Sequence, residues 1–152
     1  MATHYYWRVG ARIKLDPQKV GEHLLQLSKQ LHGSLSAGQV LEDGRSPKSI
    51  TNAHFDWNDS TAAEKHRLDQ ARQLLNCLVM VDHKQKIAEP TRVFVNLKTV
   101  EKRSYIPLVT VMTDPTLRQA TLDEALKEIE KFKEKYKHLK ELADIFAALD
   151  NL

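Results

Sequence analysis

The chain has 152 residues, of which 41% are hydrophobic and 28% are charged, and its formal net charge is +3. Such a length and composition are typical of one globular domain that can bury a sizeable core. An excess of 23 basic over 20 acidic residues is too small to indicate a nucleic-acid partner by itself. The only cysteine, Cys77, excludes an internal disulfide and is typical of a reducing compartment.

The sequence also argues against a membrane or secreted protein. No apolar run approaches the ~20 residues that a membrane-spanning helix needs. The N-terminal segment MATHYYWRVG lacks the apolar core and the cleavage site of a signal peptide. We therefore expect a cytoplasmic protein that has no membrane partner.

The N-terminal third predicts one strand and two helices. Residues 5–15, YYWRVGARIKL, carry aromatic and β-branched side chains that favour a strand, although a glycine interrupts them. Asp16–Pro17 predicts a helix start, because the carboxylate can cap the helix and proline suits its first position. This helix should end at Gly33, which suits a left-handed C-terminal cap. A second, shorter helix is predicted over 36–43, before Gly44.

The middle of the chain predicts a loop followed by a helix. Residues 44–59 are polar and rich in turn formers, which predicts an ordered loop with one helical turn that anchors its aromatic side chains in the core. Thr61 and Glu64 match a capping box, so a helix should begin there and end near Asn76.

Three short apolar segments after that helix favour strands, at residues 77–81, 93–97 and 105–108. Strands that follow one another in sequence suit an antiparallel meander, here with a turn at 101–102 between the last two. The sequence thus predicts an α+β domain that is mostly helical, with N-terminal helices, a small antiparallel β-meander and a long C-terminal helix. We expect residues 1–152 to form one domain.

The last third, residues 115–150, predicts one long amphipathic helix rich in lysine and glutamate. Two sets of residues repeat at intervals of seven and form an almost unbroken heptad seam: Leu122, Ile129, Tyr136 and Ala143, and Ala125, Phe132, Leu139 and Phe146. The helix should begin either at Asp114–Pro115 or at a capping box formed by Thr121 and Glu124. If it begins at Pro115, it would be about 54 Å long at roughly 1.5 Å per residue.

Such a seam indicates a covering surface, either in the same monomer or on a second copy. Aromatic side chains and alanines favour packing within the monomer over a regular two-stranded coil, and both alternatives stay open. The candidate interface residues are Phe132, Tyr136, Leu139 and Phe146. Lysine–glutamate pairs on the other face, such as Glu128–Lys131, indicate a solvated surface and not a polyanion track. A scaffold of this kind depends on a continuous rod whose apolar stripe is covered by protein.

The stretch HFDWNDSTAAEKHRLDQARQLL resembles a motif of a group of small proteins encoded by bacteriophages and prophages. They share an acidic-aromatic turn, an alanine-alanine-glutamate helix start and a glutamine-alanine-arginine segment, here at Phe55, Trp57, Asp59, Ala62, Ala63, Glu64, Arg67, Gln70, Ala71 and Arg72. The likeness extends from about Val20 to the end of the chain, and the N-terminal YYWRVG segment lies outside it. It implies a phage setting, in the host cytoplasm or in the virion, and no catalytic activity.

The sequence indicates no enzyme and no cofactor. His54 and Asp56 form an H-x-D pair that could begin an iron site, with His66 or His83 as a further ligand. The pair lies in a loop before a helix, so local hydrogen bonding and capping are the favoured interpretation. Cys77 lies in an apolar run, where a buried thiol is inert. We therefore assign no catalytic, cofactor-binding or metal-binding residue.

Nucleic-acid binding has two weak signals. Residues 17–43 could form a helix-turn-helix, although Lys29 stands where that motif favours a small residue. A basic set on the middle helix and the loop before it could contact phosphates: Arg45, Lys48, Arg67 and Arg72. The favoured alternative is that two of these arginines pair with nearby carboxylates: Arg67 and Arg72 with Glu64, Asp69, Asp56 or Asp59.

These patterns predict a non-enzymatic bacteriophage or prophage accessory protein that acts by protein–protein binding as a homo-oligomer, in virion assembly or host takeover. One alternative is a DNA-associated phage regulator or packaging factor that uses the basic set. A third hypothesis is an inhibitor of a host defence system.

Overall fold

The structure is a computed structural model of the chain, and it describes residues 3–59, 63–81, 89–100 and 102–152. Its elements are β1 (His4–Trp7), α1 (Pro17–Gln30), α2 (Ala37–Arg45), η1 (Asn52–His54), α3 (Ala63–Cys77), β2 (Leu78–Val81), β3 (Thr91–Arg92), β4 (Phe94–Lys98), β5 (Arg103–Pro107), α4 (Leu108–Thr113), α5 (Pro115–Tyr136), η2 (Lys140–Leu142) and α6 (Ala143–Leu149). The predicted α+β class is confirmed, since helices predominate and the strands form small antiparallel sheets.

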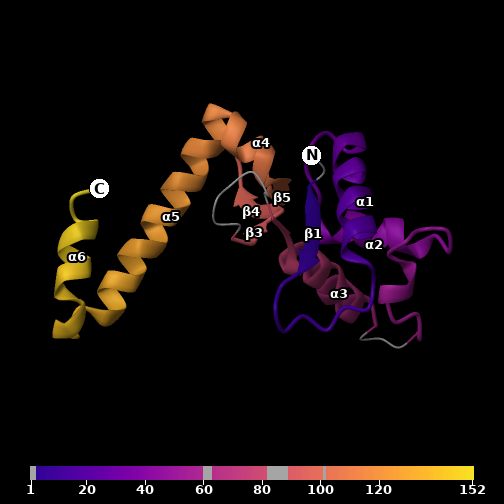
Figure 1. Ribbon diagram of the computed structural model, residues 1–152, viewed down its shortest axis with the longest axis horizontal. Coiled ribbons are helices and arrows are strands. Elements are labelled where there is room, and N and C mark those ends of the chain that lie inside the picture. Colours follow the sequence, from indigo (N-terminus) through magenta and orange to yellow (C-terminus); the bar gives the residue numbers. More distant parts are fainter. Residues whose placement is uncertain (1–2, 60–62, 82–88, 101) are drawn as a thin grey trace.

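Figure 1 shows a body that extends from β1 to α4 and an arm, formed by α5 and α6, that projects from it. None of the helices in the described ranges combines the length and the apolar character that crossing a bilayer requires.

The first two helices begin where their capping residues predict. The Asp16 carboxylate accepts a hydrogen bond from the Gln18 amide at 2.9 Å and caps α1. After α1 the chain turns through Gly33, whose φ of 91° is in the left-handed region that favours glycine. In α2, Ser36 and Gln39 form a reciprocal capping box. Local hydrogen bonds of this kind are visible in the sequence because donor and acceptor lie only three residues apart.

The main hydrophobic core lies where α1, α2 and α3 meet the three-stranded sheet. Each helix contributes fully buried side chains: Val20 and Leu24 from α1, Val40 and Leu41 from α2, and Leu74 and Leu75 from α3. A second, smaller cluster of Leu97, Ile106 and Val111 joins the β4–β5 hairpin to α4. This second cluster is where α5 begins to pack.

The strands form two sheets, so the predicted single meander is wrong. β1 and β3 pair with the two edges of β2, whereas β4 pairs with β5 in a separate hairpin. The chain leaves the first sheet at Val93, whose N–H donates to the Leu78 carbonyl at 3.3 Å. The Val93 carbonyl accepts from the Leu108 amide at 2.8 Å. The meander fails because β1 and β3 occupy both edges of β2, so no edge remains for β4.

Two smaller predictions also need correction. The predicted strand over 5–15 is shorter, because the chain turns at Gly10 (φ 87°) after β1. The predicted strand over 105–108 ends at Pro107, and Leu108 begins α4, a helix that was not predicted. The predicted turn in the loop over 44–59 is confirmed as η1. The predicted capping residue Thr61 lies outside the described residues.

The continuous C-terminal rod over 115–150 is wrong. α5 begins at Pro115, capped by the Asp114 carboxylate, but it ends at Tyr136. The chain then turns, and α6 lies beside the far end of α5 (Figure 1). This turn brings the rings of Phe132 and Phe146 to 5.9 Å, whereas a straight helix would hold these residues about 21 Å apart. The helix therefore breaks where folding back covers apolar surface.

Gly44 marks the closest approach between α2 and the loop that follows it. The prediction that the helix stops before Gly44 is wrong, since α2 continues through it to Arg45. A Cβ added at Gly44 would lie 2.5 Å from Phe55 Cε2 and 3.2 Å from Thr51 Oγ1. The glycine is thus required by packing and not by a turn.

We expect Gly44→Ala to lower the free energy of unfolding by about 1–3 kcal/mol, because the new methyl group overpacks the Phe55 ring. Gly38→Ala in the same helix is the matched control, since a Cβ there meets nothing closer than Ser36 Oγ at 3.8 Å. That control should gain about 0.5–1 kcal/mol through the higher helix propensity of alanine. Urea unfolding followed by circular dichroism measures both, and a stabilised Gly44→Ala variant would contradict the packing argument.

Candidate functional site

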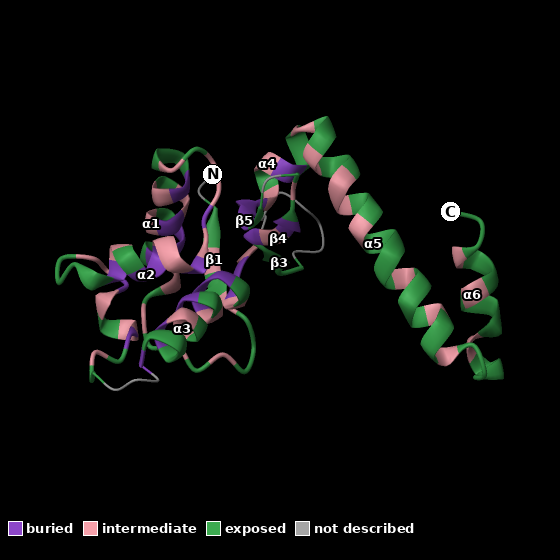
Figure 2. Ribbon diagram, turned by 180° about the vertical axis from the view of Figure 1, so that it is seen from behind, coloured by how far each residue is buried: buried purple, intermediate pink, exposed green. Residues whose placement is uncertain are grey.

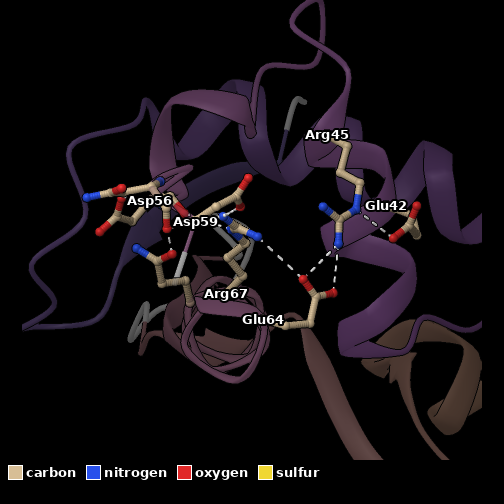
Figure 3. Close-up of polar contacts among 8 residues, drawn as sticks. Glu42, Arg45, Asp56, Asp59, Glu64 and Arg67 are labelled. Carbon is tan, nitrogen blue, oxygen red and sulfur yellow. Dashed lines mark hydrogen bonds and ion pairs between the residues drawn. The ribbon is translucent and has the colours of Figure 1, made fainter. Parts of the chain in front are cut away.

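The Arg67 side chain is buried, with 6% of its surface exposed, and joins α3 to the loop before it (Figure 3). Its Nε donates to the Asp56 carbonyl and its Nη2 donates to Asp59 Oδ1, both at 2.8 Å. Its Nη1 lies 3.5 Å from Glu64 Oε2. The guanidinium carbon lies 5.2 Å from the centre of the Trp57 ring, within the range of a cation–π contact. The Arg67 guanidinium therefore binds the Asp56 carbonyl and the Asp59 carboxylate of the loop and lies beside Glu64 of α3.

Arg45 extends the same network to α2. Its Nε donates to Glu42 at 2.8 Å, and its Nη2 donates to both carboxylate oxygens of Glu64 at 2.7 and 2.9 Å. The Arg45 guanidinium also lies 5.9 Å from the Trp57 ring. Hydrogen bonds from Arg45, and then from Arg67, lower the pKa of Glu64 below its usual value. The network thus ties α2, the acidic-aromatic turn and the start of α3 together.

The four candidate nucleic-acid contacts do not form one cationic surface. Arg72 Nη1 pairs with Asp69 at 2.7 Å on the exposed side of α3. Arg45 and Arg67 hold the carboxylates described above, and the predicted pairing of Arg67 and Arg72 with acidic neighbours is confirmed. Lys48 has no ion pair within the described residues. The second helix of the helix-turn-helix hypothesis, α2, packs against α3 and carries Arg45 as its single basic residue.

His54 and Asp56, the candidate metal pair, are held by local hydrogen bonds to Gln70. His54 Nε2 lies 3.0 Å from the Gln70 carbonyl, and the Asp56 amide donates to Gln70 Oε1 at 3.0 Å. In the part of the chain that the structure describes, no three histidine, cysteine or acidic side chains are placed to share a metal ion. His83 lies outside that part. Burial lowers the pKa of His54, and its hydrogen bond to Gln70 partly opposes this effect.

The aromatic residues among the candidate interface positions contact one another within the arm. The Phe132 ring lies 4.9 Å from Tyr136 and 5.9 Å from Phe146. Beside them an ion pair joins Lys133 of α5 to Asp150, just after α6. Leu139, in the turn, remains 37% exposed. The aromatic seam residues thus hold the helical hairpin together and do not cover the sheet or α1.

The middle of α5 carries apolar side chains that are largely exposed in the described chain. We call Leu122, Ala125, Leu126 and Ile129 the open stripe. Leu122 is 51% exposed and Leu126 is 37% exposed, whereas Ile129 is half-buried. Figure 2 shows α5 crossing from the body to α6 without a buried residue, which agrees with its burial pattern. The stripe is therefore largely uncovered in a single copy, contrary to the expectation of a covered rod.

Sequence reasoning missed part of this surface. Leu126 lies beside the heptad seam, four residues after Leu122, and that spacing could have identified it. Val109 and Met112 of α4 are 64% and 53% exposed near the start of α5. Their β-branched surroundings favour a strand, so the helix that presents them was not predicted.

Comparisons of this chain with protein-family models, with curated proteins and with solved structures found no match.

Replacing Arg67 tests whether its cationic group serves the fold. Arg67→Met keeps an apolar stem but loses the hydrogen bonds to Asp56 and Asp59, and we expect a loss of roughly 1.5–3 kcal/mol in unfolding free energy. Arg72→Met is the matched control, because its pair is exposed and should be worth less than about 1 kcal/mol. Guanidinium chloride unfolding distinguishes the two variants. Equal losses of unfolding free energy would mean that the buried hydrogen bonds of Arg67 add no stability beyond that of an exposed ion pair.

The lowered pKa of His54 predicts a pH dependence of stability. Below the ordinary value of 6.5 the unfolded chain takes up the histidine proton more readily than the folded chain, so the unfolding free energy falls as the pH falls. His54→Gln should flatten this slope between pH 6.5 and the lower pKa of the folded state. His66→Gln, at an exposed position of α3, should keep the wild-type slope. Thermal unfolding across this pH range is the measurement, and identical slopes for all three proteins would contradict the burial argument.

Proposed function

We propose that this protein is a non-enzymatic binding protein that associates with a second copy of itself through its arm. The observation that carries the proposal is the open stripe on a helix that projects from the body. Monomeric proteins rarely expose contiguous apolar patches without a binding role. The arm is not a continuous rod but a short helical hairpin with one largely uncovered stretch.

The position of the open stripe favours association over packing in the same chain. At its start, α5 packs through Leu117 and Ala120 on the second hydrophobic cluster. At its far end, Phe132 contacts Phe146 of α6 and stays 43% exposed. The open stripe lies between these two contacts, so folding of the single chain leaves it largely in water. A leucine side chain gains about 1.5–3 kcal/mol on full burial from water, so the partly exposed side chains of the stripe would each gain a fraction of this.

The charge pattern of α5 does not fix the orientation of the second copy. Residues 115–130 carry four acidic and two basic side chains, whereas residues 131–137 carry four basic and one acidic. An antiparallel pair centred on the open stripe would place Asp123 opposite Glu128, and a parallel pair would also place like charges together. The proposal of a second copy therefore depends on the apolar stripe alone.

The phage setting of the proposal rests on the likeness of residues 55–72 to small phage proteins. In that setting, self-association suits an accessory protein that binds other proteins in virion assembly or host takeover, in the host cytoplasm or in the virion. The DNA-associated alternative is less supported, because the arginines it needs are engaged by carboxylates.

Analytical ultracentrifugation of the full chain tests the proposal. We expect a dimer that becomes a monomer in the double variant Leu122→Glu, Leu126→Glu, because two carboxylates would be buried in the interface. Helicity by circular dichroism should stay unchanged, since both positions are exposed in one copy.

Val100→Glu is the matched control, because it adds the same charge at an apolar residue that is fully exposed outside the arm. This control should remain a dimer. A wild-type protein that stays monomeric at the highest soluble concentration would overturn the proposal, as would a dimer that both variants retain.

A further inference from the structure

A cleft of about 860 Å³ lies in the body between the three-stranded sheet and β4. One wall is the outer face of the sheet, where Tyr6 is in register with Val79 and Val79 with Arg92. The other wall is β4, which contributes Phe94 and Asn96. The volume falls in the range of about 300–1,000 Å³ that is common for small-ligand sites.

The lining combines aromatic and aliphatic side chains with a few polar groups, as binding sites for small ligands do. Tyr6 is 45% exposed although it lies in a strand, and Val9 beside the cleft is fully exposed. No acidic residue is among the described lining residues. The cleft thus presents flat apolar surface to solvent without a negative charge.

Two arginines of the cleft have no carboxylate partner in the part of the chain that the structure describes. Arg45, Arg67 and Arg103 each pair with an acidic side chain. Arg8 and Arg92 line the cleft and form no ion pair within the described residues. Their guanidinium groups therefore leave an unbalanced positive charge at the rim, which favours an anionic ligand and above all phosphate.

Asn96 adds a third observation that points to a ligand. Its Oδ1 is buried and has no hydrogen-bond donor among the described groups, although buried polar atoms are nearly always paired. Asn96 lines the cleft together with Arg92 and Phe94. A ligand that brings an N–H donor into the cleft would satisfy this acceptor.

We propose that this cleft binds a nucleotide, either free or within a single strand of nucleic acid. Its base packs on the exposed ring of Tyr6, and a base N–H donates to Asn96 Oδ1. Its phosphate is held by Arg8 and Arg92. Stacking on aromatic side chains and phosphate contacts to arginine are the two interactions by which proteins hold unpaired nucleotides. The inference does not depend on the association of the arm.

Isothermal titration of the full chain tests it with nucleoside monophosphates, nucleosides, inorganic phosphate and short single-stranded oligonucleotides. We expect a monophosphate to bind at least tenfold more tightly than its nucleoside or than phosphate alone, since both halves of the site are used. Tighter binding of oligonucleotides than of monophosphates would assign the cleft to a single strand, and the reverse would assign it to a free nucleotide. An aromatic carboxylate that binds as well as the monophosphate would overturn the assignment to nucleotides.

Charge-reversal variants connect binding to the cleft. Arg8→Glu and Arg92→Glu should each weaken monophosphate binding by about tenfold to a hundredfold, as expected when a charge-assisted hydrogen bond is lost. Arg12→Glu is the matched control, because Arg12 is exposed and lies outside the cleft. It should bind as the wild type does. Equal affinity in all three variants, or no heat with any nucleotide, would refute the site.

Asn96→Leu separates a ligand contact from a structural role. If the unpaired oxygen serves a ligand, this variant binds the monophosphate roughly tenfold more weakly. Its melting temperature should not fall, because the replaced side chain leaves no hydrogen bond unmade in the free protein. A variant that melts lower but binds with unchanged affinity would show that Asn96 serves the fold alone.

Discussion

The arm exists because α5 is fixed to the body only along its first half. Leu117 and Ala120 pack on the second hydrophobic cluster, and Glu124 accepts hydrogen bonds from Arg103 at 3.1 Å and from the Lys98 amide at 3.4 Å. Residues 125–136 then extend about 18 Å beyond this anchor, at 1.5 Å per residue. An isolated helix of that length is marginal in water. The return of α6 and the Phe132–Phe146 contact supply the tertiary packing that this half needs. What they leave uncovered is the open stripe.

The charged motif that suggests polyanion binding serves mainly to hold the fold. Arg45 and Arg67 share Glu64 and enclose Trp57, while Asp59 takes a further hydrogen bond from Arg67. A buried guanidinium is expensive to desolvate unless its donors are paired, so burial and pairing occur together here. An arginine committed in this way is a poor phosphate ligand. Arg8 and Arg92 of the cleft differ, because no carboxylate of the described residues pairs with them.

The sequence predicted the parts of the fold that short-range interactions decide. The Asp16 and Asp114 helix starts and the pairing of Arg67 with acidic neighbours depend on groups that lie close in sequence. The pairing of β1 with β2 does not, since it joins residues near both ends of a long segment that contains three helices. The turn after Tyr136 also has no local signal, because KHLKEL contains neither glycine nor proline. The turn lets α6 pack against α5 through the Phe132–Phe146 contact, and this contact is evident only in the folded structure.

Of the candidate sites, the interface was predicted in part and the cleft was not. The heptad repeat identified Leu122 and Ile129 but also the aromatic residues that the hairpin uses internally. The cleft depends on sheet pairing, since Tyr6 and Arg92 become neighbours only through β2. No spacing in the sequence relates these residues.

The two surfaces meet at β4, and this determines how they can influence each other. Successive side chains of a strand point to opposite faces, so Phe94 and Asn96 line the cleft while Val95 and Leu97 pack in the cluster that anchors α5. A ligand that restrains β4 from one face would therefore also restrain the base of the arm on the other. Coupling between two sites is reciprocal, so association of the arms would change the affinity of the cleft by the same factor. The size of that coupling depends on how far β4 moves in the free protein. β4 is paired with β5 along one edge and packs on the anchor cluster through Val95 and Leu97. If these contacts keep β4 rigid, ligand binding in the cleft would not change the free energy of arm association.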